Sequence, residues 1–217
     1  MTGLVRKATL LAAGGLLIAS AAMAGIPSAA LSSVPTCISL VGSAAGVPDA
    51  LGNFSVTVKD LAGNPINGAS VVVDLSGCHD LALCNEQLDA GALVNCPAKT
   101  TRKFTNALGV VSFDVLGGGN GTPASTLLGG GKVFANGVLI GTPTVAAYNL
   151  DGQLGVAGGD LALFLSDFAS GQNFGRSDFD CSNSIGGGDL AFWLTGFAGG
   201  GSATFCELPP SGSISCP

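Results

Sequence analysis

The chain has 217 residues, of which only 10% are charged, 47% are hydrophobic and 35 are glycine. This hydrophobic content excludes a charge-rich disordered chain. Eight Lys and Arg residues stand against 14 Asp and Glu residues, without a basic cluster to displace counterions from phosphate, so nucleic acid is excluded as a partner.

The N-terminus has the pattern of an export signal. Arg6 and Lys7 precede an uncharged apolar stretch at residues 8–21, and residues 22–24 (Ala-Met-Ala) fit a small-x-small cleavage site. Residues 1–24 are therefore predicted to be a signal peptide, so the mature chain is expected to be secreted, extracellular or at the cell surface, without membrane contact after cleavage. An uncleaved membrane anchor is the alternative, which the short apolar stretch and its two adjacent glycines disfavour.

A small, apolar N-terminal segment at residues 25–34 leads into a region with the pattern of β structure. Phe54, Val56 and Val58 alternate with polar residues, which is the period of a half-buried strand. Asn136-Gly137 is a two-residue hairpin signal. Six or seven short strands separated by turns predict a mainly β chain, with a β-sandwich at residues 35–148. Strands are expected at residues 36–41, 54–58, 71–75, 111–115, 132–135, 138–140 and 142–148, and loops at residues 77–99 and 117–131.

Two turn motifs in this region carry a resemblance. Residues 56–71 read V-T-V-K-D-L-A-G-N-P-I-N-G-A-S-V, and residues 105–113 read T-N-A-L-G-V-V-S-F. Both resemble motifs of bacterial immunoglobulin-like domains. The resemblance implies an immunoglobulin-like β-sandwich at residues 35–148 and says almost nothing about function.

Residues 149–200 contain an internal duplication with a period of 29 residues. Each copy begins with a loop that has oxygen-bearing side chains at positions 1, 3, 5 and 12, and continues with apolar residues at helical spacing. Calcium takes about six to eight oxygen ligands, and oxygens at alternate positions of a tight loop can wrap around the ion while position 7 supplies a carbonyl. A carboxylate at position 12 also suits the positive end of the following helix. The duplication therefore predicts a pair of calcium-binding loop–helix units.

The two copies resemble the dockerin type I repeat, D-x-N-x-D-G-x-V-x-x-x-D-L. Loop one reads N-L-D-G-Q-L-G-V-A-G-G-D-L and loop two reads D-F-D-C-S-N-S-I-G-G-G-D-L. The resemblance implies a small α-helical, EF-hand-like module at residues 149–200, with calcium as cofactor and a cohesin-like domain as partner. The ligands that it implies are Asn149, Asp151, Gln153, Asp160 and the backbone oxygen of Gly155 in loop one, and Asp178, Asp180, Ser182, Asp189 and the backbone oxygen of Ser184 in loop two.

The two loops depart from the dockerin pattern to different degrees. Position 6, where glycine allows a sharp turn, is Leu154 in loop one and Asn183 in loop two, and asparagine tolerates a left-handed backbone better than leucine. Loop one has two carboxylates and loop two has three, so loop two is expected to bind calcium more tightly, with loop one weak or empty. The alternative is a metal-free helical hairpin in which the repeat serves packing alone.

Residues on the predicted helices bear on the choice of partner. Dockerins often contact cohesins through polar residues at loop positions 10 and 11, whereas both copies have Gly-Gly there, which weakens the case for a cohesin. Phe164 and Trp193 stand at equivalent positions of the two copies. We expect both in the core rather than facing a partner.

Seven cysteines in an exported chain indicate disulfide bonds, and the odd number leaves at least one unpaired or bonded between chains. A local bridge is expected within residues 78–96. The C-terminal tail at residues 201–217 is expected to fold back through a disulfide, with Cys181 as one possible partner. A zinc site that recruits His79 is the alternative, disfavoured because no C-x-x-C pair occurs. The disulfide candidates are Cys37, Cys78, Cys84, Cys96, Cys181, Cys206 and Cys216.

Catalytic groups are scarce, since the chain has one histidine, His79, and two glutamates, Glu86 and Glu207. We therefore expect no enzyme but a secreted, calcium-binding module for protein–protein interaction, whose partner is a cohesin-like domain or a further copy of the chain. One alternative is a structural subunit of an extracellular filament or surface layer, in which the uncharged segment at residues 25–48 is donated to a neighbour's sheet edge. Another is an accessory part of a secreted polysaccharide-degrading system.

Overall fold

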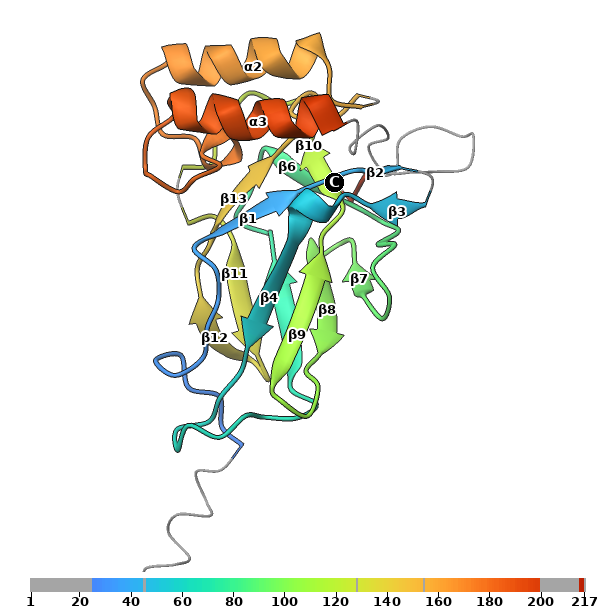
Figure 1. Cartoon of the computed structure of the whole chain (residues 1–217), viewed down its shortest axis with the longest axis vertical. Coiled ribbons are helices and arrows are strands. Elements are labelled where there is room, and N and C mark those ends of the chain that lie inside the picture. Colours follow the sequence, from blue (N-terminus) through green and yellow to red (C-terminus); the bar gives the residue numbers. More distant parts are fainter. Residues whose placement is uncertain (1–24, 45, 128, 154, 200–214, 217) are drawn as a thin grey trace, which may run out of the picture.

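The computed structural model describes residues 25–44, 46–127, 129–153, 155–199 and 215–216. Within these residues the regular structure is mainly β, and two helices lie side by side at one end of the β body (Figure 1). The predicted signal peptide at residues 1–24 lies outside the described residues, as do Leu154, Cys206 and Glu207. None of the helices within the described ranges is both long enough and apolar enough to cross a membrane.

Along the chain, strands β1 to β13 come before the two helices, and β14 follows them. The strands are β1 (Cys37–Leu40), β2 (Ser43–Ala44), β3 (Val47–Pro48), β4 (Asn53–Thr57), β5 (Ser70–Asp74), β6 (Leu81–Cys84), β7 (Leu93–Asn95), β8 (Thr100–Phe104), β9 (Val110–Asp114), β10 (Gly117–Gly119), β11 (Lys132–Ala135), β12 (Val138–Gly141), β13 (Thr144–Ala147) and β14 (Ser215–Cys216). The helices are α2 (Gly158–Ala169) and α3 (Gly187–Gly199), with single 3-10 turns at η1 (Ala50–Gly52) and η2 (Gly175–Ser177).

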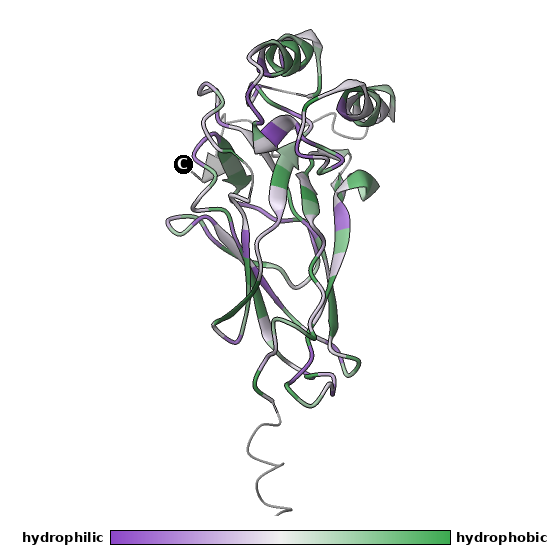
Figure 2. Cartoon of the chain, turned by 90° about the vertical axis from the view of Figure 1, so that its left-hand side faces the viewer, coloured by the Kyte–Doolittle hydropathy of each residue, from purple (hydrophilic) through white to green (hydrophobic). Residues whose placement is uncertain are grey.

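The longer strands form two layers around the core. One layer is the antiparallel five-stranded sheet β12-β11-β5-β8-β7. The other combines the parallel pair β1–β13 with the antiparallel pair β4–β9, joined by a parallel bridge between Val41 and Leu116. Figure 2 shows the layers from the side, with both helices above one end. The small sheet β10-β6-β14 lies toward that same end (Figure 1).

Alternating side chains along the strands supply the core, as the period of two predicted. In β4, Phe54 and Val56 are buried while Asn53 and Ser55 are exposed. The ring of Phe54 stacks on that of Phe113 in β9, with ring centroids 5.5 Å apart. Such alternation buries one face of a strand and leaves the other in water. The chain is therefore mainly β, as expected from its sequence.

The two turn motifs that precede β5 and β9 lie against each other. The hydroxyl of Thr105 donates a 2.6 Å hydrogen bond to the carbonyl oxygen of Ile66 and accepts a 2.8 Å bond from the N–H of Ala69. Gly109 has a φ of +71°, and a Cβ there would lie 2.5 Å from the carbonyl oxygen of Val58. Only glycine fits at that position, so this motif residue is explained by contact between the turns.

Two segments that were expected to be loops contain short strands, which corrects the prediction. Residues 77–99 include β6 and β7, and residues 117–131 include β10. All four residues of β6 are buried, so no alternation marks it as a strand. The strand β10 is made of glycines because the backbone of β6 lies close to it: a Cβ on Gly117 would lie 2.5 Å from the carbonyl oxygen of Ala82.

The N-terminal segment at residues 25–34 pairs within its own chain. Ser33 and Thr57 exchange two backbone hydrogen bonds of 2.8 and 2.9 Å, and Ser28 donates a third, of 2.8 Å, to Lys59. These bonds cover part of the free edge of β4. In this structure the segment is therefore used by the chain itself rather than donated to a neighbour.

Candidate metal centre

No linker separates the β body from the repeats. Tyr148 follows β13 directly, and Asn149 opens loop one. The indole N–H of Trp193 donates a 3.0 Å hydrogen bond to the carbonyl oxygen of Tyr148, and the ring of Phe179 lies 4.9 Å from that of Tyr148. Trp193 and Phe164 are each 1% exposed, so the expectation that both belong to the core is confirmed.

The position-12 aspartates hold the two loops in the same way. Oδ1 of Asp160 accepts the N–H groups of Leu150 at 2.6 Å and Asp151 at 3.0 Å, and Oδ2 accepts that of Ala157 at 2.7 Å. Both aspartates are buried in the first turn of a helix, where a negative charge is favoured. The sequence repeat is therefore also a repeat of hydrogen bonds. In loop two, Asp189 accepts the equivalent groups of Phe179 at 2.7 Å, Asp180 at 3.2 Å and Gly186 at 2.8 Å.

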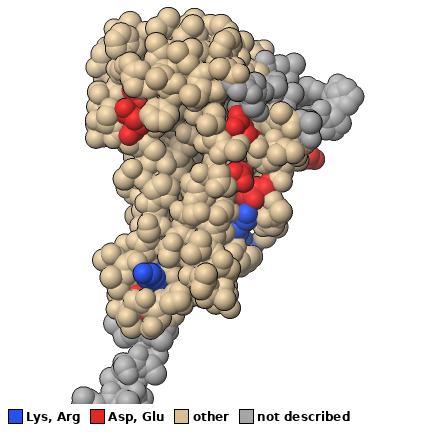
Figure 3. All heavy atoms as spheres, viewed as in Figure 1, with Lys and Arg blue, Asp and Glu red and all other residues tan. Residues whose placement is uncertain are grey.

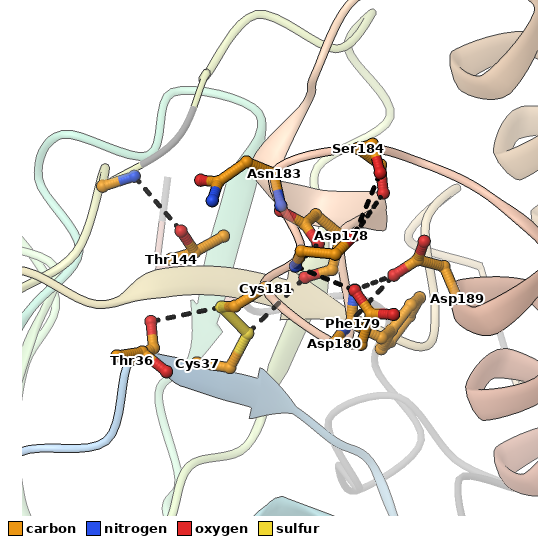
Figure 4. The surroundings of a disulfide bond; sticks show 12 residues. Thr36, Cys37, Thr144, Asp178, Phe179, Asp180, Cys181, Asn183, Ser184 and Asp189 are labelled. Carbon is orange, nitrogen blue, oxygen red and sulfur yellow. Dashed lines mark hydrogen bonds between the residues drawn. A yellow bond between two sulfur atoms is a disulfide. The ribbon is translucent and has the colours of Figure 1, made fainter.

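Loop two gathers three carboxylates. Ligand oxygens of Asp178, Asp180 and Asp189 all lie within 4.8 Å of one another (Figure 4). The N–H groups of Ser182 and Asn183 donate to the carboxylate of Asp178 at 3.1 and 3.2 Å, which folds the loop around it. Within the described ranges, no other group of three such ligands occurs.

The electrostatics of the cluster call for a positive charge. Burial raises the pKa of Asp178, and the charge of Asp189, then that of Asp180, raises it further against the opposing N–H groups of the loop. The two ion pairs found among the described side chains, Lys103–Asp89 and Arg176–Asp167, lie elsewhere. A divalent cation is the partner that three converging carboxylates fit, because each carboxylate keeps an oxygen that accepts at most one of these hydrogen bonds and so has a lone pair left; only Oδ1 of Asp189 accepts two.

Loop one is satisfied without a cation. The side-chain amide of Asn149 donates to the carbonyl oxygens of Gln153 at 2.6 Å and Gly155 at 3.0 Å, and its oxygen accepts the N–H of Gly152 at 2.8 Å. The carbonyl of Gly155 is the position-7 ligand that the resemblance implies. In this arrangement the amide nitrogen takes the place that the ion would have.

The other residues singled out in the two loops are Asn183 at position 6 and the predicted ligands Ser182, Ser184 and Gln153. Asn183 has a φ of +65°, in the left-handed region expected of position 6. The hydroxyl of Ser182 donates a 3.1 Å hydrogen bond to the carbonyl oxygen of Ser184 and lies 3.0 Å from its hydroxyl. Gln153 is exposed, and its backbone N–H donates to Asp151 at 2.8 Å. Ser182 and Ser184 thus stay beside the cluster, while Gln153 contributes only backbone groups to loop one.

Four of the disulfide candidates are bonded, but Cys181 has another partner than the one considered from the sequence. Cys181 is bonded to Cys37 across 144 residues, so it is not the partner of the C-terminal tail. Cys84 and Cys96 are also disulfide-bonded, while Cys78 is a buried free thiol whose pKa burial raises to about 12. The zinc alternative is wrong for this state, because disulfide sulfurs are not the thiolates that zinc needs. His79 is exposed, and with Cys84 and Cys96 in disulfides it lacks the set of thiolates with which it would share a zinc ion.

A buried ion pair that the sequence analysis did not single out holds the connection between the repeats. The guanidinium of Arg176 donates to both oxygens of Asp167 on α2, at 2.7 and 2.9 Å, and to the carbonyl oxygen of Thr122 at 3.1 Å. Ser177 donates a further 2.7 Å bond to Asp167. Arg176 is the only basic residue after Lys132, and that isolation was the available signal.

The two helices expose apolar side chains and bury their charges. All three acidic residues of the helices, Asp160, Asp167 and Asp189, are buried. Four large apolar residues at repeat-equivalent positions are between 44% and 54% exposed, and we call them the helix patch: Leu165, Phe168, Leu194 and Phe197. Figure 3 shows that this end of the molecule is almost free of charged side chains on the side in view.

Comparisons with models of protein families, with curated proteins and with solved structures find nothing that matches this chain. The inference of function therefore depends on the two loops, the disulfide that fastens one of them, and the helix patch.

Proposed function

We propose that this chain is a secreted, non-catalytic module that binds one calcium ion in loop two and docks onto a protein partner. The observation that carries the calcium proposal is the convergence of Asp178, Asp180 and Asp189. The hydroxyl of Ser182 and the carbonyl of Ser184 add neutral oxygens beside them. Hard oxygen donors and surplus negative charge favour calcium over softer metals.

Loop one is proposed to remain free of calcium. Asn149 would have to withdraw two hydrogen bonds from the carbonyls of Gln153 and Gly155 before those oxygens could face an ion. Asp151 and Asp160 alone would then supply the charge. Affinity falls with ligand charge, so a loop that is already satisfied competes poorly for the ion.

The docking proposal rests on the helix patch and on the two resemblances. An immunoglobulin-like β-sandwich that carries a dockerin-like repeat would present α2 and α3 to a cohesin-like domain. The absence of polar residues at positions 10 and 11 is offset by apolar area, because a patch such as Leu165 with Phe168 buries well in an interface. Because of the duplication, Leu194 and Phe197 on α3 occupy the positions that Leu165 and Phe168 occupy on α2.

Calorimetric titration of the chelator-treated mature chain with calcium tests the metal proposal. One equivalent of calcium should bind, with an affinity in the roughly nanomolar to millimolar range of calcium loops. The variant Asp178→Asn should lose that binding, and Glu86→Gln, which removes an exposed carboxylate elsewhere, should keep it. Binding that survives Asp178→Asn, or no binding at all by the unaltered chain, would reject calcium in loop two.

Capture on immobilised cohesin domains, with light scattering of the chain alone, tests the docking proposal. A discrete complex that the double variant Phe168→Ser/Phe197→Ser loses is the expected result. Phe104 on β8 is as exposed as Phe168, so Phe104→Ser is the matched control and should bind normally. Regular assemblies of the chain alone, without cohesin capture, would instead favour the structural-subunit function.

A further inference from the structure

Loop two alternates between residues that face the acidic cluster and residues that fasten the loop. Asp178 and Asp180 belong to the cluster, whereas Phe179 between them is buried against Tyr148. The next residue after Asp180 is Cys181, whose sulfur is bonded to Cys37 (Figure 4). The cluster is thus held by one apolar anchor and one covalent anchor.

The covalent anchor joins the loop to the β body. Cys37 is the first residue of β1, where it pairs with Thr144 of β13. Its Sγ lies 3.7 Å from the carbonyl oxygen of Asp178, and Sγ of Cys181 lies 3.3 Å from that of Thr36. Neither sulfur carries a proton in the disulfide, so these are contacts rather than hydrogen bonds. The bond therefore ties the segment to β1 at Cys181, and the sulfur of Cys37 also contacts the backbone of Asp178.

The backbone at Cys181 shows what the anchor holds in place. Cys181 has a φ of +54°, a left-handed conformation that residues with a Cβ rarely adopt. The equivalent position of loop one is Gly152, with a φ of +71°, where no Cβ opposes it. Without the bond, we expect Cys181 to return to negative φ and the adjacent Asp180 and Ser182 to turn away from the cluster.

We propose that the Cys37–Cys181 disulfide and the cation of loop two are thermodynamically coupled, so that the site is sensitive to redox state. The oxidised chain holds the carboxylates ready for the ion, and the bound ion protects the disulfide against reduction. The proposal rests on calcium binding in loop two. Coupling is reciprocal, so the ratio of calcium dissociation constants in the reduced and oxidised states equals the change that calcium makes in the thiol–disulfide equilibrium.

The chemical step is thiol–disulfide exchange with an external dithiol. A thiolate of the dithiol attacks one sulfur of the bond, and the other protein sulfur leaves as a thiolate. The second thiol of the dithiol then attacks its own sulfur in the mixed disulfide, so that the second protein sulfur leaves, the chain gains two thiols and the dithiol becomes a cyclic disulfide. Cys37 and Cys181 are both partly exposed. A pocket of about 320 Å³ lined in part by Thr36, Cys181 and Asn183 opens beside the bond, so a small reductant can reach it.

The first test equilibrates the unaltered chain with a dithiol and its disulfide, with calcium or with a chelator. Alkylation and peptide mass spectrometry then give the reduced fraction of Cys37 and Cys181 separately from that of Cys84 and Cys96. Calcium should lower the reduced-to-oxidised ratio of the first pair roughly 10-fold, within the usual range of site coupling. The bonds of Cys84 and Cys96 serve as internal controls and should not respond.

The second test measures calcium affinity in the double variant Cys37→Ser/Cys181→Ser. Its dissociation constant should rise roughly 10-fold, to match the first test, whereas Cys78→Ser, which removes the free buried thiol, should bind as the unaltered chain does. Equal affinity with and without the disulfide would overturn the coupling and leave calcium binding intact. Failure of the unaltered chain to bind calcium would reject both proposals. If the double variant does not fold, the first test on the unaltered chain decides whether calcium and the disulfide are coupled.

Discussion

Asn149 and Asp178 occupy the same position in the two loops and make opposite hydrogen bonds. The amide of Asn149 donates to two carbonyl oxygens of its own loop, whereas the carboxylate of Asp178 only accepts, from the N–H groups of Ser182 and Asn183. In the proposed function, the donor in loop one stands in for a cation, whereas the acceptor in loop two leaves room for one. The two loops therefore differ at position 1, where loop one has an amide nitrogen that donates and loop two has a carboxylate oxygen that accepts.

Asn149→Asp should convert loop one into a second calcium site. The variant removes both donated bonds, so without calcium it should be destabilised by about 1–3 kcal/mol, because the carbonyl oxygens of Gln153 and of buried Gly155 lose their donor. With calcium it should recover, and calorimetry should count two ions per chain. A count of one, with no calcium-dependent gain in melting temperature over the unaltered chain, would show that the position-1 side chain does not decide occupancy.

Arg176→Met should be among the most destabilising single changes in the chain. It leaves the carboxylate of Asp167 buried without its bidentate partner, at a cost of about 3–5 kcal/mol in the free energy of unfolding. The double variant Arg176→Met/Asp167→Leu should be less destabilised than Arg176→Met alone, since no charge then stays unpaired. Urea unfolding of the two single variants and the double variant measures this coupling, and additive losses would contradict it.

Gly196→Ala should disturb the packing of α3, although alanine is the better helix former. A Cβ on Gly196 would collide with the ring of Tyr148, so the helix must shift, with a loss of about 1–3 kcal/mol. Gly187→Ala in the first turn of the same helix is the matched control, because its Cβ would meet no atom within 4 Å. Thermal melting compares the two, and equal melting temperatures would mean that α3 is not held against Tyr148.

Asp60 should contribute to stability only at pH values where it is ionised. Burial raises its pKa, but the N–H groups and side-chain amide around it, mainly those of Asn64 and Ala62, outweigh burial and hold the pKa below the ordinary value of 3.8. Because the folded-state pKa is depressed, this stability is present above the unfolded value and lost as pH falls through the folded one.

The variant Asp60→Asn should therefore be less stable than the unaltered chain near neutral pH, with a gap that closes in acid. Urea midpoints measured from about pH 7 down to about pH 2 check this. A gap that stays constant over the whole range would show that the charge of Asp60 is not the stabilising feature.

The parts of this structure that follow a local period could be predicted from the sequence. The alternation at Phe54, Val56 and Val58 predicted β4, and the hairpin between β11 and β12 turns at Asn136 and Gly137, both at positive φ. The spacing of Asp178, Asp180 and Asp189 likewise anticipated that they lie together. Each is set by neighbours within about one turn or one loop, where periodicity is informative.

Features that depend on distant partners could not be predicted. The bond between Cys37 and Cys181 joins residues 144 apart, and spacing carries no information about such a pair. The strand β10 is all glycine and forms because of its neighbour β6, so local propensity argues against it. The side-chain amide of Asn149 donates hydrogen bonds because the carbonyl oxygens of Gln153 and Gly155 lie beside it, and the sequence alone does not reveal that arrangement.

The anchor at Cys181 also gives the repeat module a second covalent connection to the β body, beside the backbone that runs from Tyr148 into loop one. If a partner held by α2 and α3 is pulled away, tension on loop two passes through the sulfur–sulfur bond into β1 and across its parallel pairing with β13. Loop one is joined to β13 by the backbone itself, through Tyr148. Force applied to the helices would thus reach the β body along two covalent paths, one through Tyr148 and one through the disulfide.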